Sequence, residues 1–599
     1  MRKKFSKSVG LALSLALVLC LLSMPLSAET TLKEAMDGIV TRLYANLNQE
    51  ALSSLTQEKV LDLITNEERE VLSTRYWYFD VYIPVVVSII RNVDQQVVPF
   101  WLEKAGFVKT ALVVKNTEGW AFEVWQKKFD AGRVELGING FDMHRTVYFV
   151  CVGPETSGTK VEISNLFPPH EVVHQMLKGA WMYRDWDTLY IEELPESLEG
   201  QLLLTTYRGR AREAHLVNAF RSTPYPSSDK PDHVMLTWSE DPRTTQTVQW
   251  RTNTDVENGV VRYRARGTSP DASVEVLAER ELIEDRLLMN DRYTHRHTAV
   301  LRGLNPSTTY VYTVGSQDND TCSNAAEFTT APDQETPFSF VYFGDTHSSQ
   351  DWGHLLHAAD ERHPETAFYI IGGDVVNTGL FRDDWDKVLE YSSGVFNRKP
   401  IAFSLGNHDD QDGLGAWMPL ALFAFPRNGP QGVEPERTYS FRYGNALFLV
   451  LDVGTSPEIQ ARWMEEQLAS TDATWTFGIY HFPLYYLEED DEYAAIRRRW
   501  EQVFAKYHLD MMLQGHVHYY LRTRPMKNGW PVESPADGTI YIISVGLPGR
   551  ERPRKVPDYV EKYMSGGPWY QKLDINGKQL VYRTYDEDAR VCDEMIIEK

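Results

Sequence analysis

The sequence predicts a multidomain protein in which an α+β domain and an all-β domain precede a larger α/β domain. Three observations predict this order. Helical periodicity followed by β-branched runs fills residues 29–228, alternating polar and apolar residues fill residues 229–332, and nearly continuous apolar runs fill residues 336–599. Alternation is typical of strands with one exposed face, and continuous apolar runs are typical of strands buried on both faces. The length of the chain allows about three or four domains.

The first 28 residues have the pattern of a secretory signal peptide. The basic "MRKK" is followed by the apolar "GLALSLALVLCLL" and then by "SMPLSAET", with Ala28 at a plausible cleavage point. The apolar stretch is short for a membrane span. We therefore expect a cleaved leader and a secreted or periplasmic protein. The alternatives are an uncleaved anchor or lipid attached to Cys20.

The formal net charge of −23 limits the partners that the protein can bind. Cleavage of the leader would remove basic residues and make the mature chain more acidic still. An acidic surface repels phosphate backbones, so we expect no nucleic acid in bulk. We also expect no membrane attachment after cleavage. The mature chain would keep Cys151, Cys322 and Cys592, which allow at most one intramolecular disulfide. The oligomeric state is not predicted.

Residues 29–228 are predicted to form an α+β domain whose role the sequence does not indicate. "LKEAMDGIVTRLYANL" has helical periodicity, and Thr65 and Glu68 have the spacing of a capping box. "VYIPVVVSII" and "RTVYFVCVG" are typical of strands. The Ser- and Pro-rich segment 222–233 is predicted to be a linker.

Within this domain, "HEVVH" at residues 170–174 matches the H-E-x-x-H pattern of zinc proteases. Pro168 and Pro169 directly precede it, which would place the motif in the first turn of a helix. No second protease signature accompanies it. We therefore expect a solvated or interface helix here and no zinc site.

Residues 229–332 contain alternating strands such as "TQTVQWRT". Leu304, Pro306 and Tyr310 are spaced as in the tyrosine corner of immunoglobulin-like sandwiches. The segment resembles a fibronectin type III domain. This resemblance implies a spacer or binding module, or a domain that positions its neighbour.

The third region, residues 336–599, contains six apolar runs, and five of them end in residues that bind metals or transfer protons. The sixth ends near Asp452. Ligands of parallel sheets bind beyond the carboxyl ends of the strands, so these residues are expected to meet there. The five endings are Gly344-Asp345-Thr346-His347, Gly372-Gly373-Asp374, Gly406-Asn407-His408-Asp409, His481-Phe482-Pro483 and Gly515-His516-Val517-His518.

The residue types at these endings indicate a pair of metal ions. Asp, Asn and His without a thiolate suit Fe, Mn or Zn. The donors outnumber those that one ion uses while keeping a solvent position, whereas two ions that share a carboxylate would use them all. Two ions about 3.5 to 4 Å apart stabilise the attacking and leaving oxygens of an in-line displacement at phosphorus. We expect two divalent or trivalent ions whose identity the sequence does not give.

The order D-x-H, G-D, G-N-H-D, H and G-H-x-H resembles the calcineurin-like metallophosphoesterase superfamily. The resemblance covers residues 336–599 and implies a four-layer fold of two sheets flanked by helices. It also implies which residues bind each ion. One ion would be held by Asp345, His347 and His518, the other by Asn407, His481 and His516, with Asp374 bridging the two.

The same resemblance implies that His408 is not a ligand. It would face the phosphoryl group and the leaving oxygen as a general acid or charge stabiliser, and Asp409 would orient it. The nucleophile would be a metal-bound hydroxide.

The flanking segments "TYSFRYGNALFLVLD" and "GHVHYYLRTRP" look like purple acid phosphatases, which also carry a sandwich domain before the catalytic one. This chain departs from them at two positions. They have Gly where His347 stands, and a metal-binding Tyr where Asn377 stands. We therefore expect an intact two-metal site without a tyrosinate ligand, and Asn377 beside the metals.

The expected function is that of an exported, dinuclear-metal-dependent phosphoester hydrolase that favours small phosphomonoesters. The alternatives are a phosphodiesterase acting on nucleotides or glycerophosphodiesters, and a binding protein with a vestigial catalytic domain. No expected ligand is missing, which speaks against the vestigial domain. The segments after His481 and His518 are expected to line the mouth of the site with Tyr485, Tyr486, Tyr519 and Tyr520.

Overall fold

The computed structural model describes residues 30–143, 146–169, 172–184, 188–317, 321–410, 414–487, 493–549 and 555–599. The predicted leader lies outside these ranges. Within them, no helix has the length and apolar character needed to cross a membrane.

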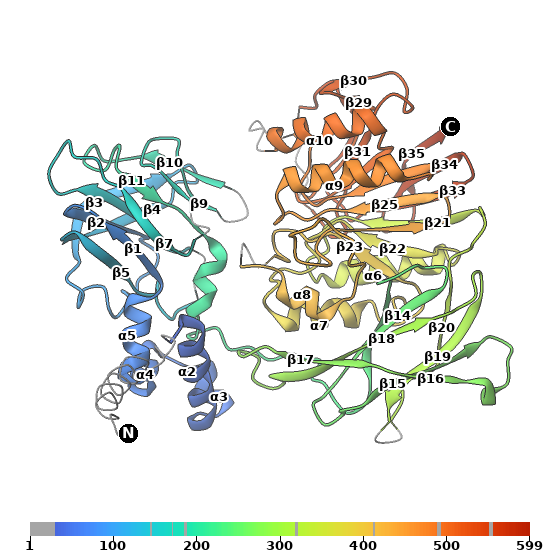
Figure 1. Cartoon of the computed structure of the whole chain (residues 1–599), viewed down its shortest axis with the longest axis horizontal. Coiled ribbons are helices and arrows are strands. Elements are labelled where there is room, and N and C mark those ends of the chain that lie inside the picture. Colours follow the sequence, from blue (N-terminus) through green and yellow to red (C-terminus); the bar gives the residue numbers. More distant parts are fainter. Residues whose placement is uncertain are drawn as a thin grey trace, which may run out of the picture.

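The N-terminal domain opens with four helices that cap one end of its sheets (Figure 1). Two of them begin with a complete capping box, Thr31 with Glu34 and Thr65 with Glu68, so the box predicted at Thr65 is confirmed. Each box satisfies two backbone N–H groups that a helix start would otherwise leave unpaired. The helices are α2 (Leu32–Asn46), α3 (Gln49–Ser53), α4 (Gln57–Leu63) and α5 (Asn66–Thr74).

Strands make up most of this domain. A three-stranded sheet has the order β5-β1-β7, and a nine-stranded sheet has the order β12-β9-β10-β3-β4-β2-β6-β11-β8. The helix η1 (Arg208–Ala214) follows the last strand. The strands are β1 (Trp77–Val81), β2 (Val85–Asn92), β3 (Val108–Asn116), β4 (Ala121–Phe129), β5 (Gly132–Leu136), β6 (Phe149–Pro154), β7 (Ile163–Phe167), β8 (Val173–Gln175), β9 (Trp181–Arg184), β10 (Thr188–Glu193), β11 (Leu202–Leu204) and β12 (Thr206–Tyr207).

The prediction of a helix at "HEVVH" is wrong for the part of the motif that the structure describes. His170 and Glu171 lie outside the described residues, but His174 lies in strand β8 and packs edge-on against Trp181. β8 pairs with β11, so sheet pairing overrides the local helical pattern. Cys151, Cys322 and Cys592 are all free thiols.

The second domain is a sandwich of two four-stranded sheets, β13-β14-β18-β17 and β16-β15-β19-β20. Its core lies between the sheets around Trp250, which stacks on His297. The elements are β13 (Asp232–Thr237), β14 (Thr245–Thr252), β15 (Gly259–Ala265), η2 (Pro270–Ala272), β16 (Val274–Leu277), β17 (Glu279–Glu284), β18 (Tyr293–Arg302), β19 (Thr309–Ser316) and β20 (Ala326–Thr329).

The predicted tyrosine corner is present. The hydroxyl oxygen of Tyr310 accepts a hydrogen bond of 2.9 Å from the backbone N–H of Asn305. The Tyr310 ring stacks on Phe328 and is buried. This contact ties the start of β19 back to the loop before it.

The third domain contains two sheets that pack face to face. The first has the order β23-β22-β21-β33-β34-β35 and the second β24-β25-β26-β27-β31-β28-β32. The strands are β21 (Phe338–Phe343), β22 (Phe368–Ile371), β23 (Ile401–Phe403), β24 (Tyr439–Tyr443), β25 (Ala446–Val450), β26 (Trp475–Ile479), β27 (Met511–Gln514), β28 (Tyr520–Thr523), β31 (Ile540–Ile543), β32 (Val560–Met564), β33 (Tyr570–Asn576), β34 (Gln579–Tyr585) and β35 (Val591–Glu598), with a small hairpin of β29 (Met526–Lys527) and β30 (Trp530–Pro531).

Helices cover the outer faces and complete the predicted four layers. Phe340 of β21 meets Phe448 of β25 between the sheets, with ring centroids 5.2 Å apart. The alternate residues of β25, Leu447 and Leu449, pack in a second cluster with Trp500 of α10. The helices are α6 (Gln350–Arg362), α7 (Arg382–Tyr391), α8 (Trp417–Leu422), α9 (Pro457–Ser470) and α10 (Ala494–Tyr507).

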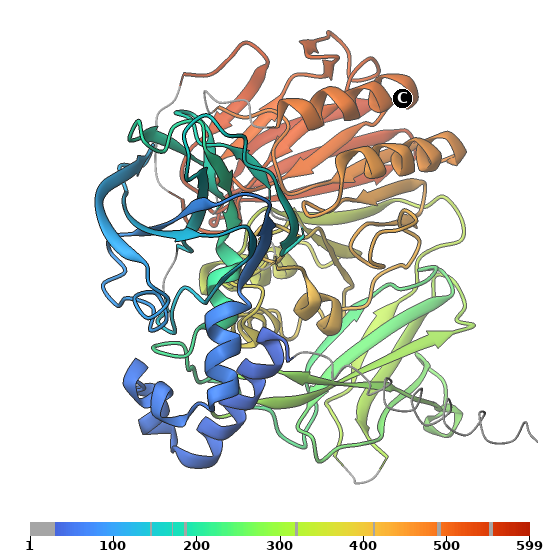
Figure 2. The same ribbon diagram turned by 60° about the vertical axis from the view of Figure 1, so that its left-hand side comes forward.

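The N-terminal domain stands beside the third domain, and the sandwich lies below the third domain (Figure 1). In the turned view, the strands of the N-terminal domain pass in front of the third domain (Figure 2). The sandwich contacts the third domain through several hydrogen bonds, among them Leu236 N–H to the Phe396 carbonyl and Tyr312 hydroxyl to the Asn397 carbonyl. The sandwich and the third domain are therefore directly joined.

Replacing Tyr310 by Phe should lower the free energy of unfolding by about 1 to 2 kcal/mol, because the N–H of Asn305 loses its acceptor. Urea unfolding followed by tryptophan fluorescence measures this. Tyr263→Phe is the matched control, since the Tyr263 hydroxyl has no hydrogen bond within the described part of the chain. An equal loss in both variants would contradict the role of the corner.

Candidate metal centre

The candidate centre lies where parallel strands of both sheets end. β21, β22 and β23 run parallel in the first sheet, and β25, β26, β27 and β31 run parallel in the second. Their carboxyl ends therefore meet at one edge of the double layer. Asp345 follows β21, Asp374 follows β22, and His481 follows β26.

Glycines allow two carboxylates to approach the backbone closely at this edge. A Cβ on Gly406 would lie 2.1 Å from Oδ1 of Asp374, and a Cβ on Gly515 would lie 2.2 Å from Oδ1 of Asp345. No side chain fits at either position. The G-N-H-D and G-H-x-H patterns thus require glycine because a carboxylate occupies the space.

Each of these carboxylates uses one oxygen for the backbone and presents the other to histidine nitrogens. Oδ1 of Asp345 accepts the N–H of His516 at 2.7 Å, and Oδ1 of Asp374 accepts the N–H of His408 at 2.9 Å. Both side chains are almost completely buried. The fixed Oδ1 contacts orient the two Oδ2 atoms toward the centre.

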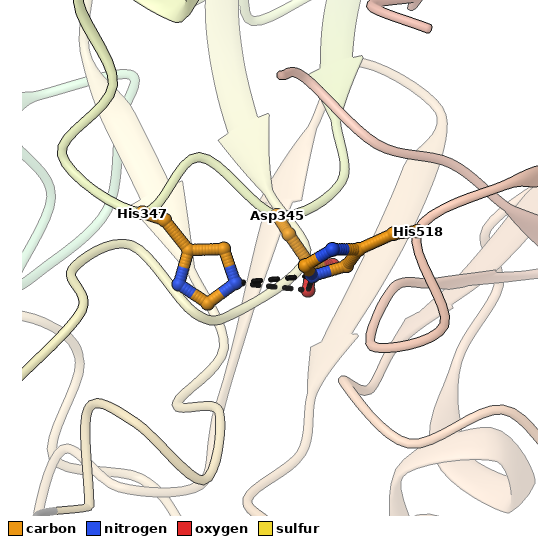
Figure 3. A group of neighbouring side chains, drawn as sticks. All are labelled: Asp345, His347 and His518. Atoms are coloured by element: carbon orange, nitrogen blue, oxygen red, sulfur yellow. Dashed lines mark hydrogen bonds and ion pairs between the residues drawn. The ribbon is translucent and has the colours of Figure 1, made fainter. Parts of the chain in front are cut away.

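Asp345, His347 and His518 form the first group of donors (Figure 3). Nε2 of His518 lies 3.0 Å from Oδ2 of Asp345, and Nε2 of His347 lies 3.6 Å from the same oxygen. The two Nε2 atoms are 3.1 Å apart. These three atoms converge on one point in the way that ligands of an ion do.

Asp374, His481 and His516 form the second group. Nε2 of His481 lies 3.1 Å from Oδ2 of Asp374 and 3.1 Å from Oδ1 of Asn407. Asp374 also groups with His347 and His408. It therefore stands between the two sets, which is the position of a bridging ligand. The structure thus brings together all seven residues that the sequence predicts as ligands.

The hydrogen-bond pattern fits cations at this centre. Nδ1 of His481 lies 3.0 Å from the carbonyl of Gly372 and so carries the proton. A neutral ring would turn its Nε2 lone pair toward two oxygen acceptors, so these contacts require a positive charge, either a proton on Nε2 or a cation between the atoms. Nδ2 of Asn407 is buried and has no hydrogen-bond partner among the described residues, which fits an amide oriented for its oxygen. Metal-binding histidines commonly donate their other N–H to a backbone carbonyl.

The pKa values of two histidines also indicate that the site attracts cations. Burial would lower the pKa of His481, but the carboxylates of Asp374 and Asp345 raise it to about 9. Burial together with His481 lowers the pKa of His516 to about 3, which leaves its nitrogen free to bind a metal. The site therefore attracts positive charge and keeps a neutral imidazole beside it.

Several of these residues have strained backbones. His347, Asp374, His516 and His518 all have φ between 46° and 78°, in the left-handed region that side chains disfavour. Backbone hydrogen bonds hold this geometry, since the carbonyl of Asp374 accepts N–H groups from Thr346 and His347. Such strain is typical of functional sites.

His408 lies next to this centre, held by the loop after β22. Its Nδ1 lies 2.6 Å from the carbonyl oxygen of Asn377, and its Nε2 lies 4.0 Å from Oδ2 of Asp374. The side chain of Asn377 donates to the carbonyl of His347 at 2.8 Å. Asn377 therefore supports His347 through its side chain and His408 through its backbone carbonyl.

The expectation that Asp409 orients the ring of His408 is corrected by the structure. The buried carboxylate of Asp409 accepts the N–H groups of Val375, Val376 and Gly406 at 3.0 to 3.2 Å. Burial, with the charge of Asp374, raises its pKa to about 7. Asp409 therefore joins the loops after β22 and β23, and the backbone carbonyl of Asn377 contacts the imidazole. No side-chain pattern could have indicated that carbonyl.

The expectation that tyrosines line the mouth is also wrong. Tyr485, Tyr486, Tyr519 and Tyr520 are all buried in hydrophobic clusters. The hydroxyl of Tyr485 donates to Glu501, and that of Tyr520 donates to Asp593. A tyrosine that the sequence analysis missed, Tyr493, lies closer, with its hydroxyl 3.2 Å from Nε2 of His516. It stands just before α10, outside every recognised motif.

Comparison with known proteins agrees with this geometry. Residues 338–520 match the calcineurin-like phosphoesterase family, and residues 231–330 match the purple acid phosphatase N-terminal domain. Together with the His and Asp clusters, these matches identify a calcineurin-like phosphoesterase domain in residues 338–520 that carries a candidate binuclear metal site.

More narrowly, the chain has the architecture of the purple acid phosphatases, a sandwich domain followed by the phosphoesterase domain. An uncharacterized protein of Mycobacterium tuberculosis is 25% identical over 53% of this chain and 69% of its own length. The purple acid phosphatase of Glycine max is 23% identical over 56% and 72%. Purple acid phosphatase 15 of Arabidopsis thaliana is 24% identical over 49% and 60%.

A solved structure shows the same fold. Purple acid phosphatase PPD1 from yellow lupin (Lupinus luteus) seeds superposes with a TM-score of 0.53 at 16% identity. The match covers 79% of this chain and 82% of the lupin chain. This is more of the chain than the sandwich and catalytic domains make up, so the likeness in fold extends into the N-terminal domain.

Replacing Asp374 by Asn should remove bound metal and lower phosphoester turnover by about 10²-fold or more, because the amide cannot bridge two cations. Elemental analysis and a hydrolysis assay measure the two effects. Asp452→Asn is the matched control, since Asp452 is a buried carboxylate at the end of β25 that pairs with Arg437. Full metal content in the Asp374 variant would contradict the bridging position.

Proposed function

We propose that the protein is an exported phosphomonoesterase that acts on small phosphoesters. One observation supports the preference for monoesters. Charged and polar groups surround the positions that metals would occupy, whereas the tyrosines expected at the mouth are buried in hydrophobic clusters, namely Tyr485, Tyr486, Tyr519 and Tyr520. A monoester dianion presents three polar oxygens, which cations and imidazoles can contact. A diester requires additional apolar or aromatic surface.

When bound, a pair of metal ions would supply Lewis acidity toward the phosphoryl oxygens and would make water more acidic. Asp345, His347 and His518 would hold one ion, Asn407, His481 and His516 the other, and Asp374 both. The fixed Oδ1 contacts of Asp345 and Asp374 preorganise this set before substrate arrives.

His408 is proposed to transfer a proton to the leaving oxygen. The carbonyl of Asn377 fixes the proton on Nδ1, so Nε2 is the nitrogen turned toward the centre. A protonated Nε2 would donate to the oxygen that departs from phosphorus. This role needs an imidazole held in place but not bound to metal, and the contact with Asn377 meets that requirement.

The proposed location is secreted or periplasmic, and it rests on the leader pattern of residues 1–28. The net charge of −23 supports a small phosphoester as the partner, since it disfavours long polyanions such as nucleic acids.

Replacing His408 by Ala should keep the metal content but lower kcat on alkyl monoesters by about 10²- to 10⁴-fold. The loss should be much smaller for 4-nitrophenyl phosphate, whose leaving group needs no proton. Steady-state kinetics on both substrates, with elemental analysis of the same preparation, measure this. Equal losses on both substrates would indicate charge stabilisation in place of proton transfer.

The preference itself is tested with matched 4-nitrophenyl mono- and diesters. We expect kcat/KM to favour the monoester at each pH at which the enzyme is active. A diester advantage of about tenfold, which corresponds to about 1.4 kcal/mol of transition-state free energy, would assign the protein to the phosphodiesterases.

A further inference from the structure

The N-terminal domain reaches the catalytic domain at the first turn of helix α7. Arg221, at the end of the N-terminal domain, lies with its guanidinium carbon 3.6 Å from the ring centroid of Phe381. Its Nε donates to Oδ1 of Asp383 at 2.9 Å, and its terminal nitrogen pairs with Asp285 of the sandwich. One side chain thus joins all three domains.

A second residue of the N-terminal domain contacts the same ring. Arg212 of η1 lies with its guanidinium carbon 5.7 Å from the centroid of Phe381. η1 itself is fixed to the domain, because the hydroxyl of Tyr76 donates to the carbonyl of Arg210 at 2.9 Å. The position of the Phe381 ring therefore depends on how the N-terminal domain is docked, because two arginines of that domain contact the ring.

Buried ion pairs hold the rest of this turn. Arg382 is fully buried and pairs with Asp291 at 3.0 Å, while its backbone N–H donates to Asp285. Arg382 is therefore unable to clamp a substrate phosphate. One turn further, Asp386 accepts from Arg251 of the sandwich at 2.9 Å. Charges buried in this way are costly to separate, so the docking geometry is well defined.

The turn that ends at Phe381 is also the turn that holds His408. The carbonyl of Asn377 contacts the imidazole at 2.6 Å, and the N–H of Gly379 donates to the backbone carbonyl of His408 at 2.8 Å. The N–H of Phe381 closes the turn on the carbonyl of Thr378. Only a few residues thus separate the ring under Arg221 from the atoms that position His408.

We infer that the N-terminal domain is a working part of the active site, because its Arg221 fixes Phe381 and thereby the loop that positions His408. Arg221 is a positioning residue and does not touch substrate. This inference rests on the proposed role of His408 and gives residues 30–221 a function in proton transfer. Displacements of about 1 Å at a catalytic group can cost about 10²-fold in rate, so a modest loosening has a measurable effect.

Two full-length variants test the inference. Arg221→Lys keeps the charge but cannot contact Asp285, Asp383 and the ring together, because an ammonium lacks the planar fork. Phe381→Leu keeps all the ion pairs and removes the ring. For each we expect kcat on an alkyl monoester to fall about 10-fold, kcat on 4-nitrophenyl phosphate to change less than about twofold, and metal content to stay at the wild-type level.

Tyr312→Phe is the matched control. It removes a hydrogen bond of 2.6 Å to the carbonyl of Asn397, a contact between domains beyond the other end of α7. We expect wild-type rates on both substrates. A loss of equal size on alkyl and aryl esters in the Arg221 and Phe381 variants would mean general loosening and would overturn the inference.

A double-mutant comparison separates this inference from the function on which it rests. In the His408→Ala enzyme, adding Arg221→Lys should change alkyl-ester turnover by less than about twofold, since the group that Arg221 positions is gone. Multiplicative losses would overturn the inference alone. If His408→Ala itself lacks leaving-group dependence, the proposed role of His408 fails first, and the inference fails with it.

Discussion

The rest of the site depends on how two buried carboxylates, Asp345 and Asp374, are held at the ends of two sheets. Each is fixed through one oxygen to a backbone N–H across a glycine, and each turns its other oxygen toward imidazole nitrogens. Anions buried so deeply need positive partners, and in the described part of the chain the ion-pair partners of these two carboxylates are all histidines. The strand ends, the glycines and the strained backbone together hold two buried negative charges close to each other, and bound cations would stabilise this arrangement. Metal binding and the stability of this edge are therefore linked, because ions that bind only the folded arrangement stabilise it.

The residues of the centre could be predicted from sequence because parallel strands bring their carboxyl ends together whatever the loops between them do. The order of the motifs from Asp345 to His518 therefore predicted which side chains meet in space. In the same way, the spacing of Leu304, Pro306 and Tyr310 predicted the hydrogen bond of Tyr310. Contacts made by backbone atoms or by side-chain packing have no recognisable pattern in the sequence, so they could not be predicted. The carbonyl that holds His408, the burial of Tyr485 and the strand at His174 are set by partners distant in the chain.

The sandwich and the N-terminal domain are joined to the catalytic domain more firmly than tethered modules are. Arg251 and Arg296 of the sandwich are both buried, and the second donates to the carbonyl of Leu422 at the end of α8. Interfaces between independent domains are typically more exposed and permit relative motion. Here, charged groups lie inside the junction, so a shift of one domain against the other would break buried polar contacts such as the pair of Arg251 and Asp386. The expectation that the sandwich positions its neighbour agrees with these contacts.

The contact between Arg221 and Asp383 spans 162 positions of the chain, and this has a consequence for the order of events during synthesis. The N-terminal domain emerges first and can collapse on its own core, long before the first turn of α7 exists. Loops closed over such distances form late, because the entropy of closure is lost before the contact stabilises anything. A nascent or partly folded chain can therefore contain every metal ligand and still hydrolyse a substrate slowly. In this protein, full activity would be reached only after the individual domains have folded, when Arg221 of the N-terminal domain docks on helix α7.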